Sequence, residues 1–599
     1  MKGLENVFYY LADGAQRYVG AADDYARFIA EKQLTNEELW RKFTRVFRTR
    51  EDKSDDGWRG EYFGKMMRGA VMTYRYRPNE ELYAILERTV LDLISAADEE
   101  GRIATYPPDH EFCGWDLWVR KYVLVGCLYF TDICKSAEVK EKILAAIVRH
   151  ADYIVERIGK GKTEITDTSK MYGGINSSSI LEPIVELYKK TGFERYLAFA
   201  EYLVQAGGCK DGNVLTAIES GRMPHEFPTT KAYETISYIE GVLAYAEVTG
   251  REDLVALAEK FWDAVFEGEI TIIGSAGCHG EHFDHAAETQ TEKYPKKYIM
   301  QETCVTVTWM RFSERLLRLT GKAKYSDAIE CSALNALYGA VNLRENEQYC
   351  KEEKRFLEGV PFDSYSPLVS ARRGVGIGGF KRFSDGGFYG CCACIGAAGM
   401  ALYPLSSALR SEGGVTLLFY NEGVIECRAP SGEKIEFEIS GDLALGEIKI
   451  VCHAKTPAEC SLGLRIPSWS VLPSVRANGE NEMPEAGFFT LKRVWEEGAE
   501  VRLSLNPTLQ REEKNGKTAF RYGPFALARD EGKERLFAPR KICLGEGNIE
   551  YEKNYLREGE RVRLKIKAKN GSFVFTDYAS CGKDWMKRRS RVTVWQKTK

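Results

Sequence analysis

The chain has 599 residues, 44% of them apolar and 12% aromatic, so it is long enough for several packed domains and too apolar for disorder. Its 84 basic and 87 acidic side chains leave a net charge of −3, without the clustered positive charge that nucleic acids and anionic membranes attract. No apolar run reaches the roughly 18 residues of a transmembrane helix, and the first twenty residues lack the apolar core of a signal peptide. The 16 cysteines in so long a chain favour ligands or nucleophiles over disulfides. We expect a cytoplasmic protein that binds neither nucleic acid nor membrane.

From about residue 20 to residue 410 the apolar residues follow helical spacing. Three segments share one pattern, in which an apolar helix end is followed by Thr-Gly and then by a second amphipathic helix, at Gly192, Gly250 and Gly321. Glycine at this position adopts the left-handed conformation that ends a helix, and a short link makes the next helix antiparallel. Repeated helical hairpins with long aromatic loops predict a closed α/α toroid over residues 1–410, with a cleft built by the loops.

Beyond about residue 411 the pattern changes to period-two alternation, interrupted by Gly, Pro, Asn and Asp. Segments such as KIEFEISGD, EIKIVCHA and EVRLSLNP predict an antiparallel β-sandwich over residues 411–510. Residues 511–599 continue in the same style, and we expect a second β-sandwich there or an extension of the first. Because neither segment carries a cluster of reactive side chains, we expect both to brace the toroid or to shape one wall of its cleft.

Two short stretches carry the residue types of a metal site. Glu302 and Cys304 are two positions apart, so in an extended segment both side chains lie on one side. Cys391 and Cys392 are adjacent, which strains a mutual disulfide but allows both sulfurs to bind one ion. One carboxylate and three thiolates form a donor set that Zn²⁺ accepts, and we predict that these four residues converge on one zinc ion.

The sequence alone also allows other interpretations of these residues. Cys394 follows closely, so the pairs Cys392/Cys394 and Cys391/Cys394 are also sterically possible. A buried zinc without a chemical role, or free thiols in a core, would fit the same residue types. The histidines His279, His282 and His285 form a further set that could bind zinc, which we regard as the weaker hypothesis.

Glu281 lies between two of these histidines in the glycine-containing loop CHGEHF. A loop glutamate that is desolvated near a metal can hold a proton, as a general acid must. We therefore predict that Glu281 carries protons beside the metal, although a lone loop glutamate is more often a solvated charge. Sugar sites combine flat rings with polar groups, and such residues gather at the predicted helix ends. The candidates for binding sugar hydroxyls are Trp115, Asp116, Asn176, Lys231, Tyr233, Glu234 and His279.

Taken together, these motifs resemble glycoside hydrolase family 127, which includes bacterial β-L-arabinofuranosidases. The resemblance is carried by GSAGCHGEHF, QETC, the adjacent cysteines, WDLWVRKY, KAYET and LRIPSW, and it covers nearly the whole chain. It implies an (α/α)6 barrel followed by C-terminal β-sandwiches. It also implies a zinc ion bound by Glu302, Cys304, Cys391 and Cys392, and a retaining mechanism with Cys391 as nucleophile and Glu281 as acid/base.

The chain departs from the family pattern at three places. Where the family's arabinofuranosidases have histidines in the sugar pocket, this chain has Ser179 and Lys231. The adjacent cysteines continue as CCACIG rather than CCPPN, so Cys394 is a possible substitute ligand. These departures bear on the identity of the sugar more than on the type of reaction.

The resemblance predicts a retaining exo-glycosidase that acts on short oligosaccharides. Two other classes remain as rivals. An α/α-toroid polysaccharide lyase or sugar epimerase would use a Tyr or His base and would not need the cysteines. A non-catalytic carbohydrate-binding protein would contain only a structural zinc. We also expect that the sandwich could mediate a homodimer.

Overall fold

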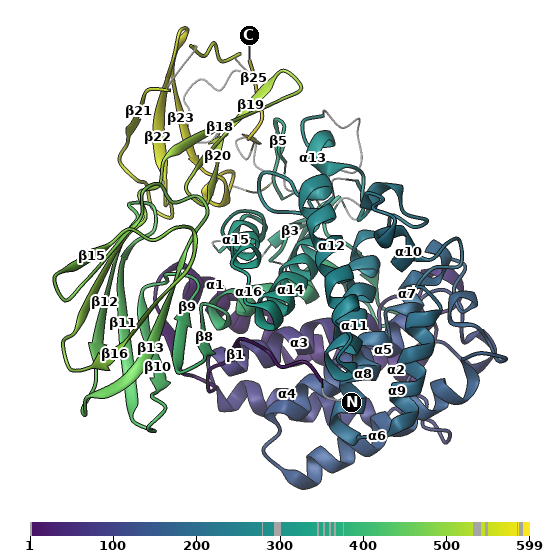
Figure 1. Cartoon of the computed structure of the whole chain (residues 1–599). Helices are drawn as coiled ribbons and strands as arrows, with labels where there is room; N and C mark the ends of the chain where they lie inside the picture. Colours follow the sequence, from purple (N-terminus) through teal and green to yellow (C-terminus); the bar gives the residue numbers. More distant parts are fainter. Residues whose placement is uncertain are drawn as a thin grey trace.

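The computed structural model describes residues 3–277, 279–292, 301–343, 347–350, 354–358, 361–363, 367–374, 376–530, 541–545, 549–583, 585 and 591–598. Helices make up the first two thirds of the chain and strands most of the remainder, and the strands lie to one side of the helices (Figure 1). Within the described residues, every helix is too short or too polar to span a lipid bilayer.

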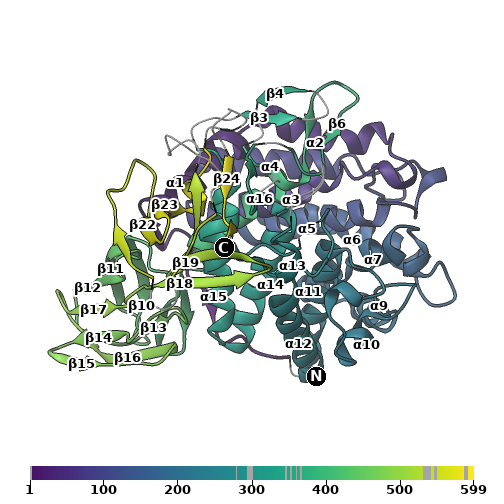
Figure 2. The same ribbon diagram turned by 90° about the horizontal axis from the view of Figure 1, so that it is seen from above.

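Six helices form the inner wall of a barrel. Each packs against the next in chain order, and the last packs against the first, so the ring is closed. Seen from above, α3, α5, α11, α14 and α16 lie close to one another, beside the strands (Figure 2). The inner helices are α3 (Glu61–Tyr76), α5 (Asp116–Ile133), α8 (Leu181–Thr191), α11 (Ala232–Thr249), α14 (Thr303–Thr320) and α16 (Cys391–Leu405). This arrangement agrees with the predicted (α/α)6 barrel.

A second layer of helices covers the inner ring. Apart from the first two, which precede α3, each of these outer helices follows an inner helix and leads to the next one, so the inner helices run in the same direction. They are α1 (Ala21–Ile29), α2 (Glu37–Thr49), α4 (Glu80–Ile94), α6 (Ala137–Arg157), α9 (Glu194–Gln205), α12 (Glu252–Glu269) and α15 (Lys324–Cys331). Three short helices lie in connections: α7 (Ile175–Ser178), α10 (Val214–Glu219) and α13 (Ala286–Thr289).

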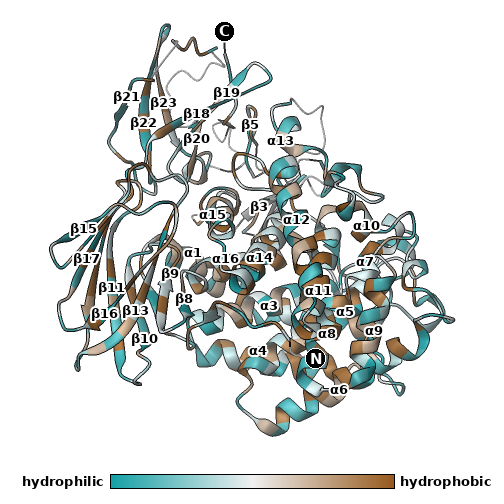
Figure 3. Ribbon diagram, viewed as in Figure 1, coloured by the Kyte–Doolittle hydropathy of each residue, from teal (hydrophilic) through white to brown (hydrophobic). Residues whose placement is uncertain are grey.

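The predicted Thr-Gly helix ends are confirmed at all three positions. Gly192, Gly250 and Gly321 cap α8, α11 and α14 with φ values of 68°, 73° and 69°. A residue with a Cβ is disfavoured at such angles, which explains why glycine ends each of these helices. The inner helices are mostly buried, whereas the outer ones have alternating apolar and polar faces (Figure 3).

Two sheets form the β-sandwich that follows the barrel. Their strand orders are β1-β8-β9-β13-β16 and β15-β14-β17-β12-β11-β10-β2. All pairs are antiparallel, as predicted, except for the parallel pair of β9 and β13. The bounds are β8 (Ala408–Ser411), β9 (Gly414–Leu417), β10 (Gly423–Arg428), β11 (Lys434–Asp442), β12 (Glu447–His453), β13 (Ala458–Ile466), β14 (Ser474–Ala477), β15 (Glu480–Glu482), β16 (Gly487–Trp495) and β17 (Glu500–Ser504).

Two short N-terminal strands complete the sandwich. They are β1 (Tyr9–Tyr10), which pairs with β8, and β2 (Gln16–Tyr18), which pairs with β10. Strands of two or three residues give no period-two signal, so the sequence did not indicate them. As a result, the N-terminal segment ties the sandwich to the barrel.

A third sheet contains the last strands of the chain. Its main order is β18-β19-β20-β23-β22-β21, with β24 and β25 pairing at its sides. β24 also pairs with β5, which lies between α15 and α16, so this sheet contacts the helical part directly. The bounds are β5 (Ala371–Arg372), β18 (Leu509–Lys514), β19 (Lys517–Tyr522), β20 (Phe525–Asp530), β21 (Tyr551–Lys553), β22 (Arg563–Ala568), β23 (Gly571–Asp577), β24 (Arg591–Thr593) and β25 (Gln596–Lys597). Two small hairpins pair β3 (Glu347–Cys350) with β4 (Arg355–Glu358), and β6 (Lys381–Arg382) with β7 (Phe388–Tyr389).

Candidate active site

Four potential metal donors meet where helices α14 and α16 begin. Glu302 caps α14 and Cys304 is its second residue, while Cys391 and Cys392 open α16. The sulfurs of Cys304 and Cys391 are 3.3 Å apart, and Glu302 Oε1 lies 3.2 Å from the Cys392 sulfur and 3.8 Å from that of Cys391. The four donor atoms all lie within 4.8 Å of one another. The structure thus brings the predicted donors together.

The donor set fits a tetrahedral metal ion. With Zn–S near 2.3 Å and Zn–O near 2.1 Å, donors at the corners of a tetrahedron are about 3.6–3.8 Å apart, close to the separations here. All four residues are buried, and Glu302 Oε2 has no hydrogen-bond partner among the described residues. A buried carboxylate oxygen without a partner is costly unless a cation compensates it. Both helix N-termini also favour negative charge on the thiolates.

Cys394 and the three histidines do not join this group. Cys394 is buried one turn further into α16, and burial raises the pKa of its thiol well above the usual value. His279 pairs with Asp284, His282 Nδ1 lies 2.9 Å from the Thr230 hydroxyl, and the ring of His285 stacks on His225 at 4.4 Å. In the described ranges no histidine belongs to a group that could hold a metal ion. The histidine triplet is therefore not the metal site of this structure.

The surroundings of Cys391 favour its ionised form. Hydrogen bonds from Cys304 and then Cys392 lower the pKa of its thiol well below the usual value, and the charges of Lys65 and Lys231 act in the same direction. In contrast, burial raises the pKa of Cys304. A nucleophilic sulfur needs to be ionised at neutral pH, and Cys391 is the cysteine that these contacts favour for this state.

Glu281 faces Lys231 across a short backbone pairing. Lys231 caps α11, and its ammonium group forms an ion pair with the Glu281 carboxylate. The backbone holds the two segments together, because Ala232 N donates to Glu281 O at 2.8 Å and Phe283 N donates to Thr230 O at 2.7 Å. Glu281 itself has a φ of 68°, an uncommon value for a residue with a Cβ. The influence of Lys231 on Cys391 links this pair electrostatically to the sulfur.

Lys65 and Glu61 also belong to the site, although the sequence did not indicate them. Lys65 Nζ lies 3.9 Å from the Cys304 sulfur and 3.0 Å from Glu61, and it sits 4.4 Å from the centre of the Tyr233 ring. Burial raises the pKa of Glu61 to about 7. In the sequence this pair looks like an ordinary i, i+4 surface ion pair, and only its WRGEYFGK context, rich in aromatic residues, could have pointed to a buried position.

The other candidate sugar-binding residues lie at the same end of the barrel, where helices α5, α7 and α11 begin. Asp116 is fully engaged by Arg120, at 2.9 Å, and by the Phe112 backbone. The Trp115 indole donates to Asp55 O at 3.1 Å. The Tyr233 hydroxyl is hydrogen bonded to that of Tyr122. Each of these three side chains is thus held by a neighbouring residue, whereas the side chain of His279 is partly exposed.

Asn176 and Glu234 retain free hydrogen-bonding capacity. Both are buried, and neither Asn176 Oδ1 nor Glu234 Oε2 has a partner among the described residues. Ser179, which stands where the resemblance implies a histidine, accepts a hydrogen bond from Lys121 Nζ at 3.2 Å. Burial lowers the pKa of Lys121 to about 7. This part of the barrel interior is therefore polar and preorganised.

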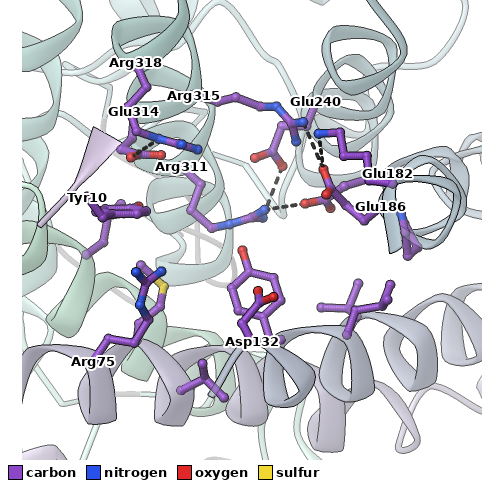
Figure 4. A pocket seen from close by; sticks show the side chains of 18 of the residues that line it. Tyr10, Arg75, Asp132, Glu182, Glu186, Glu240, Arg311, Glu314, Arg315 and Arg318 are labelled. Atoms are coloured by element: carbon purple, nitrogen blue, oxygen red, sulfur yellow. Dashed lines mark hydrogen bonds and ion pairs between the residues drawn. The ribbon is translucent and has the colours of Figure 1, made fainter. Parts of the chain in front are cut away.

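A separate cavity of about 290 Å³ lies at the opposite end of the barrel. Arg311, Arg315 and Arg318 reach it from α14, about 14 to 24 Å along the helix from Glu302. Figure 4 shows these side chains and the facing carboxylates around a common space. Arg311 pairs with Glu182 at 2.8 Å, and the other two arginines also have carboxylate partners. Because these charges compensate one another, we interpret the ion pairs around this cavity as contacts that hold the helices together and close this end of the barrel.

The fold and the four-donor centre define a class: an (α/α)6 barrel with an accessory β-sandwich and a buried Glu–Cys₃ group where its inner helices begin. The chain belongs to glycoside hydrolase family 127. Residues 18–350 match the model of the β-L-arabinofuranosidase GH127 catalytic domain, and residues 421–507 match that of the GH127 middle domain. The resemblance found in the sequence is thereby confirmed.

Individual relatives are more distant. The non-reducing end β-L-arabinofuranosidase of Bifidobacterium longum subsp. longum is 22% identical over 449 residues, which cover 68% of this chain and 64% of that protein. The matched region thus spans less than two thirds of this relative. A GH127 β-arabinofuranosidase structure has a TM-score of 0.76 at 17% identity and covers 99% of this chain and 98% of its own. A GH127 β-L-arabinofuranosidase from Geobacillus stearothermophilus T6 has a TM-score of 0.73 at 17% identity and covers 98% of this chain and all of its own. These two structures share the fold.

Proposed function

We propose that the protein is a retaining exo-glycoside hydrolase of the β-L-arabinofuranosidase type that acts on short oligosaccharides. The observation that carries this proposal is the convergence of Glu302, Cys304, Cys391 and Cys392 at the end of the barrel where Lys231 holds Glu281. Family membership supports glycoside hydrolysis, and the β-L-arabinofuranosidase activity of the Bifidobacterium relative supports the sugar. The rival lyase and epimerase reactions would leave this cysteine cluster without a role.

In this proposal Cys391 is the nucleophile and Glu281 is the acid/base. Glu281 gives a proton to the glycosidic oxygen while the Cys391 sulfur attacks the anomeric carbon and the bond to the leaving group breaks. A covalent thioglycosyl intermediate forms. Glu281, now ionised, takes a proton from water, and that water displaces the sulfur from the same face the leaving group occupied. Two inversions retain the configuration of the sugar.

The four donors would hold Zn²⁺, which keeps the cysteines deprotonated at neutral pH. Lys231 then has two effects on the chemistry. Its ion pair positions the Glu281 carboxylate, and its charge favours the thiolate of Cys391. Asn176 and Glu234, with their unpartnered buried oxygens, are the groups we propose for binding sugar hydroxyls.

We further propose that the enzyme works in the cytoplasm on imported fragments. The fourteen cysteines that the structure describes are all free thiols, which suits a reducing compartment. This part of the proposal is tested by locating the protein in fractionated cells of its source.

The test of the proposed reaction is turnover of p-nitrophenyl β-L-arabinofuranoside by Cys391→Ser, with Cys394→Ser as the matched control. Cys394 is also a buried cysteine of α16 but is not among the four donors. We expect a loss of at least about 10³-fold for Cys391→Ser and near-normal activity for the control, with both proteins folded by circular dichroism. Product configuration is followed by proton NMR. Full activity of Cys391→Ser, or an inverted product, would refute the mechanism.

A further inference from the structure

A cavity of about 380 Å³ lies where the barrel, the sandwich and the third sheet meet. We call it the seam cavity. Phe266 of α12 and Trp309 of α14 line it from the barrel, Trp469 lines it from the loop after β13, and Arg521 lines it from β19. We propose that the seam cavity is a second carbohydrate-binding site that takes a neutral monosaccharide. This site is separate from the cysteine centre, and the proposal does not depend on the reaction proposed above.

The rim of the seam cavity presents a fixed, exposed aromatic ring. Phe266 is 51% exposed, although it is a large apolar side chain. Its ring stacks on Trp262 with centroids 5.1 Å apart and planes 8° from parallel, and Trp262 in turn stacks on Trp309 at 4.9 Å. Because this stack fixes the ring, little conformational entropy is lost when a ligand packs on it. An exposed flat ring beside polar groups suits the apolar face of a sugar.

A second aromatic side chain borders the cavity from the sandwich. The indole nitrogen of Trp469 donates to Glu330 Oε2 at 2.8 Å, which holds the ring at the junction. Trp309, in the cavity wall, is fully buried, and its indole nitrogen has no partner among the described residues. A buried N–H donor without an acceptor is unfavourable, and a ligand hydroxyl or a water molecule would satisfy it.

The charged residues around the seam cavity are already paired with one another. Arg521 donates to Glu512 at 2.8 Å, and Lys514 pairs with Glu288 at 2.8 Å. Glu330 is paired with the buried Arg465 at 2.6 Å. Asp327, which also lines the cavity, shares Arg465 with Glu330 at 3.9 Å. A lining whose cations are all paired offers no net attraction to a phosphate, whereas its many donors and acceptors can bind hydroxyl groups. These features point to an uncharged, hydroxyl-rich ligand.

The size of the cavity fits this ligand class. At about 30 Å³ per water molecule, 380 Å³ has room for roughly a dozen waters, comparable to the roughly ten to twelve heavy atoms of one monosaccharide. The cavity wall includes Thr271 and Gly274, which directly precede the loop that carries Glu281. Gln290 ties this wall to the last strands, because its Oε1 accepts from Ile272 N at 2.9 Å and from the Trp595 indole at 3.2 Å.

The test is saturation-transfer NMR with L-arabinose, D-xylose and D-galactose as probes and glucose 6-phosphate as the charged comparison. We compare the wild type with Phe266→Ala and with the matched control Phe193→Ala, an exposed phenylalanine (41%) outside the cavity. Gln510→Trp adds a bulky ring at an exposed position of the cavity rim. Unlike Phe266→Ala, this second variant removes no packing contact. Thermal melting verifies that each variant is folded.

We expect at least one neutral sugar to bind the wild type and Phe193→Ala equally, and its Kd to rise at least tenfold in both Phe266→Ala and Gln510→Trp. Three outcomes would overturn the proposal: equal binding in all four proteins, stronger binding of glucose 6-phosphate, or no binding of any neutral sugar at about 50 mM, a concentration of the order expected for weak sugar sites. Sugar bound at the cysteine centre is unaffected by the rim variants, so the difference between them and the wild type reports on the seam cavity alone. The result is therefore independent of whether Cys391 proves to be a nucleophile.

Discussion

Gly379 fixes the position of the Cys391 sulfur. Its φ is +59°, and a side chain at this position would place its Cβ 2.3 Å from that sulfur. The Gly379 carbonyl accepts hydrogen bonds from the Trp58 indole at 3.1 Å and from the Tyr62 hydroxyl at 2.6 Å, so the backbone cannot easily move away. Glycine is therefore required here both by the backbone angle and by the space available.

We predict that Gly379→Ala displaces Cys391 and lowers both metal content and turnover at least tenfold, because the added methyl group overlaps the sulfur. Gly386→Ala is the matched control, since Gly386 also has a positive φ, of +89°, but nothing lies within 4 Å of its added Cβ. The backbone strain of about 1–2 kcal/mol is common to both variants. Metal content is measured by mass spectrometry and turnover with the aryl glycoside. Equal behaviour of the two variants would contradict this role of Gly379.

Lys231 provides a second test at the scale of single residues. We predict that Lys231→Met lowers kcat/KM about 10²-fold, because it removes the partner that holds Glu281 and one of the charges that favour the Cys391 thiolate. Lys231→Arg should recover part of the loss, since it restores the charge. Lys322→Met, which breaks an exposed ion pair with Glu259, is the control and should leave the rate unchanged. If Lys231→Met has the wild-type rate, Lys231 takes no part in the reaction.

The sequence allowed the grouping of the four candidate metal donors to be predicted because their chemistry is specific. Few residue types bind zinc. Adjacent cysteines and a Glu-x-Cys motif therefore indicate a shared metal site even when they lie 87 positions apart in the sequence. Lys65 and Asp116 show the opposite case. Lysine and aspartate are common on surfaces, and only the fold reveals that Lys65 is buried beside a thiol and that Asp116 is occupied by Arg120. Polar residues in a cleft cannot be sorted into sugar-binding and structural groups from the sequence alone.

At the scale of elements, the inner helices α8, α11 and α14 are held together at the far end by buried ion pairs. Arg311 of α14 bridges Glu182 of α8 at 2.8 Å and Glu240 of α11 at 3.2 Å. All three side chains are buried, and burial raises the pKa of Glu240 to about 7 even beside this arginine. A buried charge that loses its partner is strongly destabilising, so these contacts specify how the helices meet.

We predict that Arg311→Met lowers the free energy of unfolding by about 3–5 kcal/mol, because it leaves Glu182 and Glu240 buried without their shared cation. The control is Arg41→Met, which removes an exposed i, i+4 pair with Glu37 and should cost about 0.5 kcal/mol or less. Urea unfolding followed by helical circular dichroism measures both. If the two variants unfold at the same urea concentration, the buried pairs do not stabilise the barrel.

The elements themselves were predictable where local chemistry determines them. The Thr-Gly ends of α8, α11 and α14 follow from the left-handed angle that glycine allows, and the strands after residue 411 follow from alternation. The parallel pairing of β9 with β13 and the insertion of β1 and β2 into the sandwich depend on contacts between distant segments. No local pattern encodes such pairings, so only the folded structure reveals them.

At the scale of the whole molecule, the β-domains are anchored to the barrel by buried polar contacts. Arg465 of β13 pairs with Glu330 of α15 at 2.6 Å, and the amide of Asn335 bonds to the Pro524 carbonyl and the Ala526 amide at the start of β20. Because these contacts lie on helical segments next to α14 and α16, the β-domains support the same part of the barrel that carries the candidate metal centre. Loss of a metal ion from this centre should therefore lower the stability of the whole molecule.

The last prediction concerns removal of the metal. The four donors join the starts of α14 and α16, which are neighbours in the closed ring, and an ion bound only by the folded chain stabilises it. We expect that removing the metal with a chelator lowers Tm on the order of 5–10 °C and abolishes turnover, and that Zn²⁺ restores both while Mg²⁺, which prefers oxygen ligands, restores neither.

Cys304→Ala is the control, because with one donor missing its Tm should no longer respond to the chelator. Metal content is followed by mass spectrometry beside each melting curve. A wild-type protein that is verified to be metal-free and yet melts at the original temperature would show that these four side chains hold α14 and α16 together without an ion. The cluster would then be a set of buried thiols around a carboxylate, whose unpartnered oxygen Glu302 Oε2 would remain an uncompensated cost to folding.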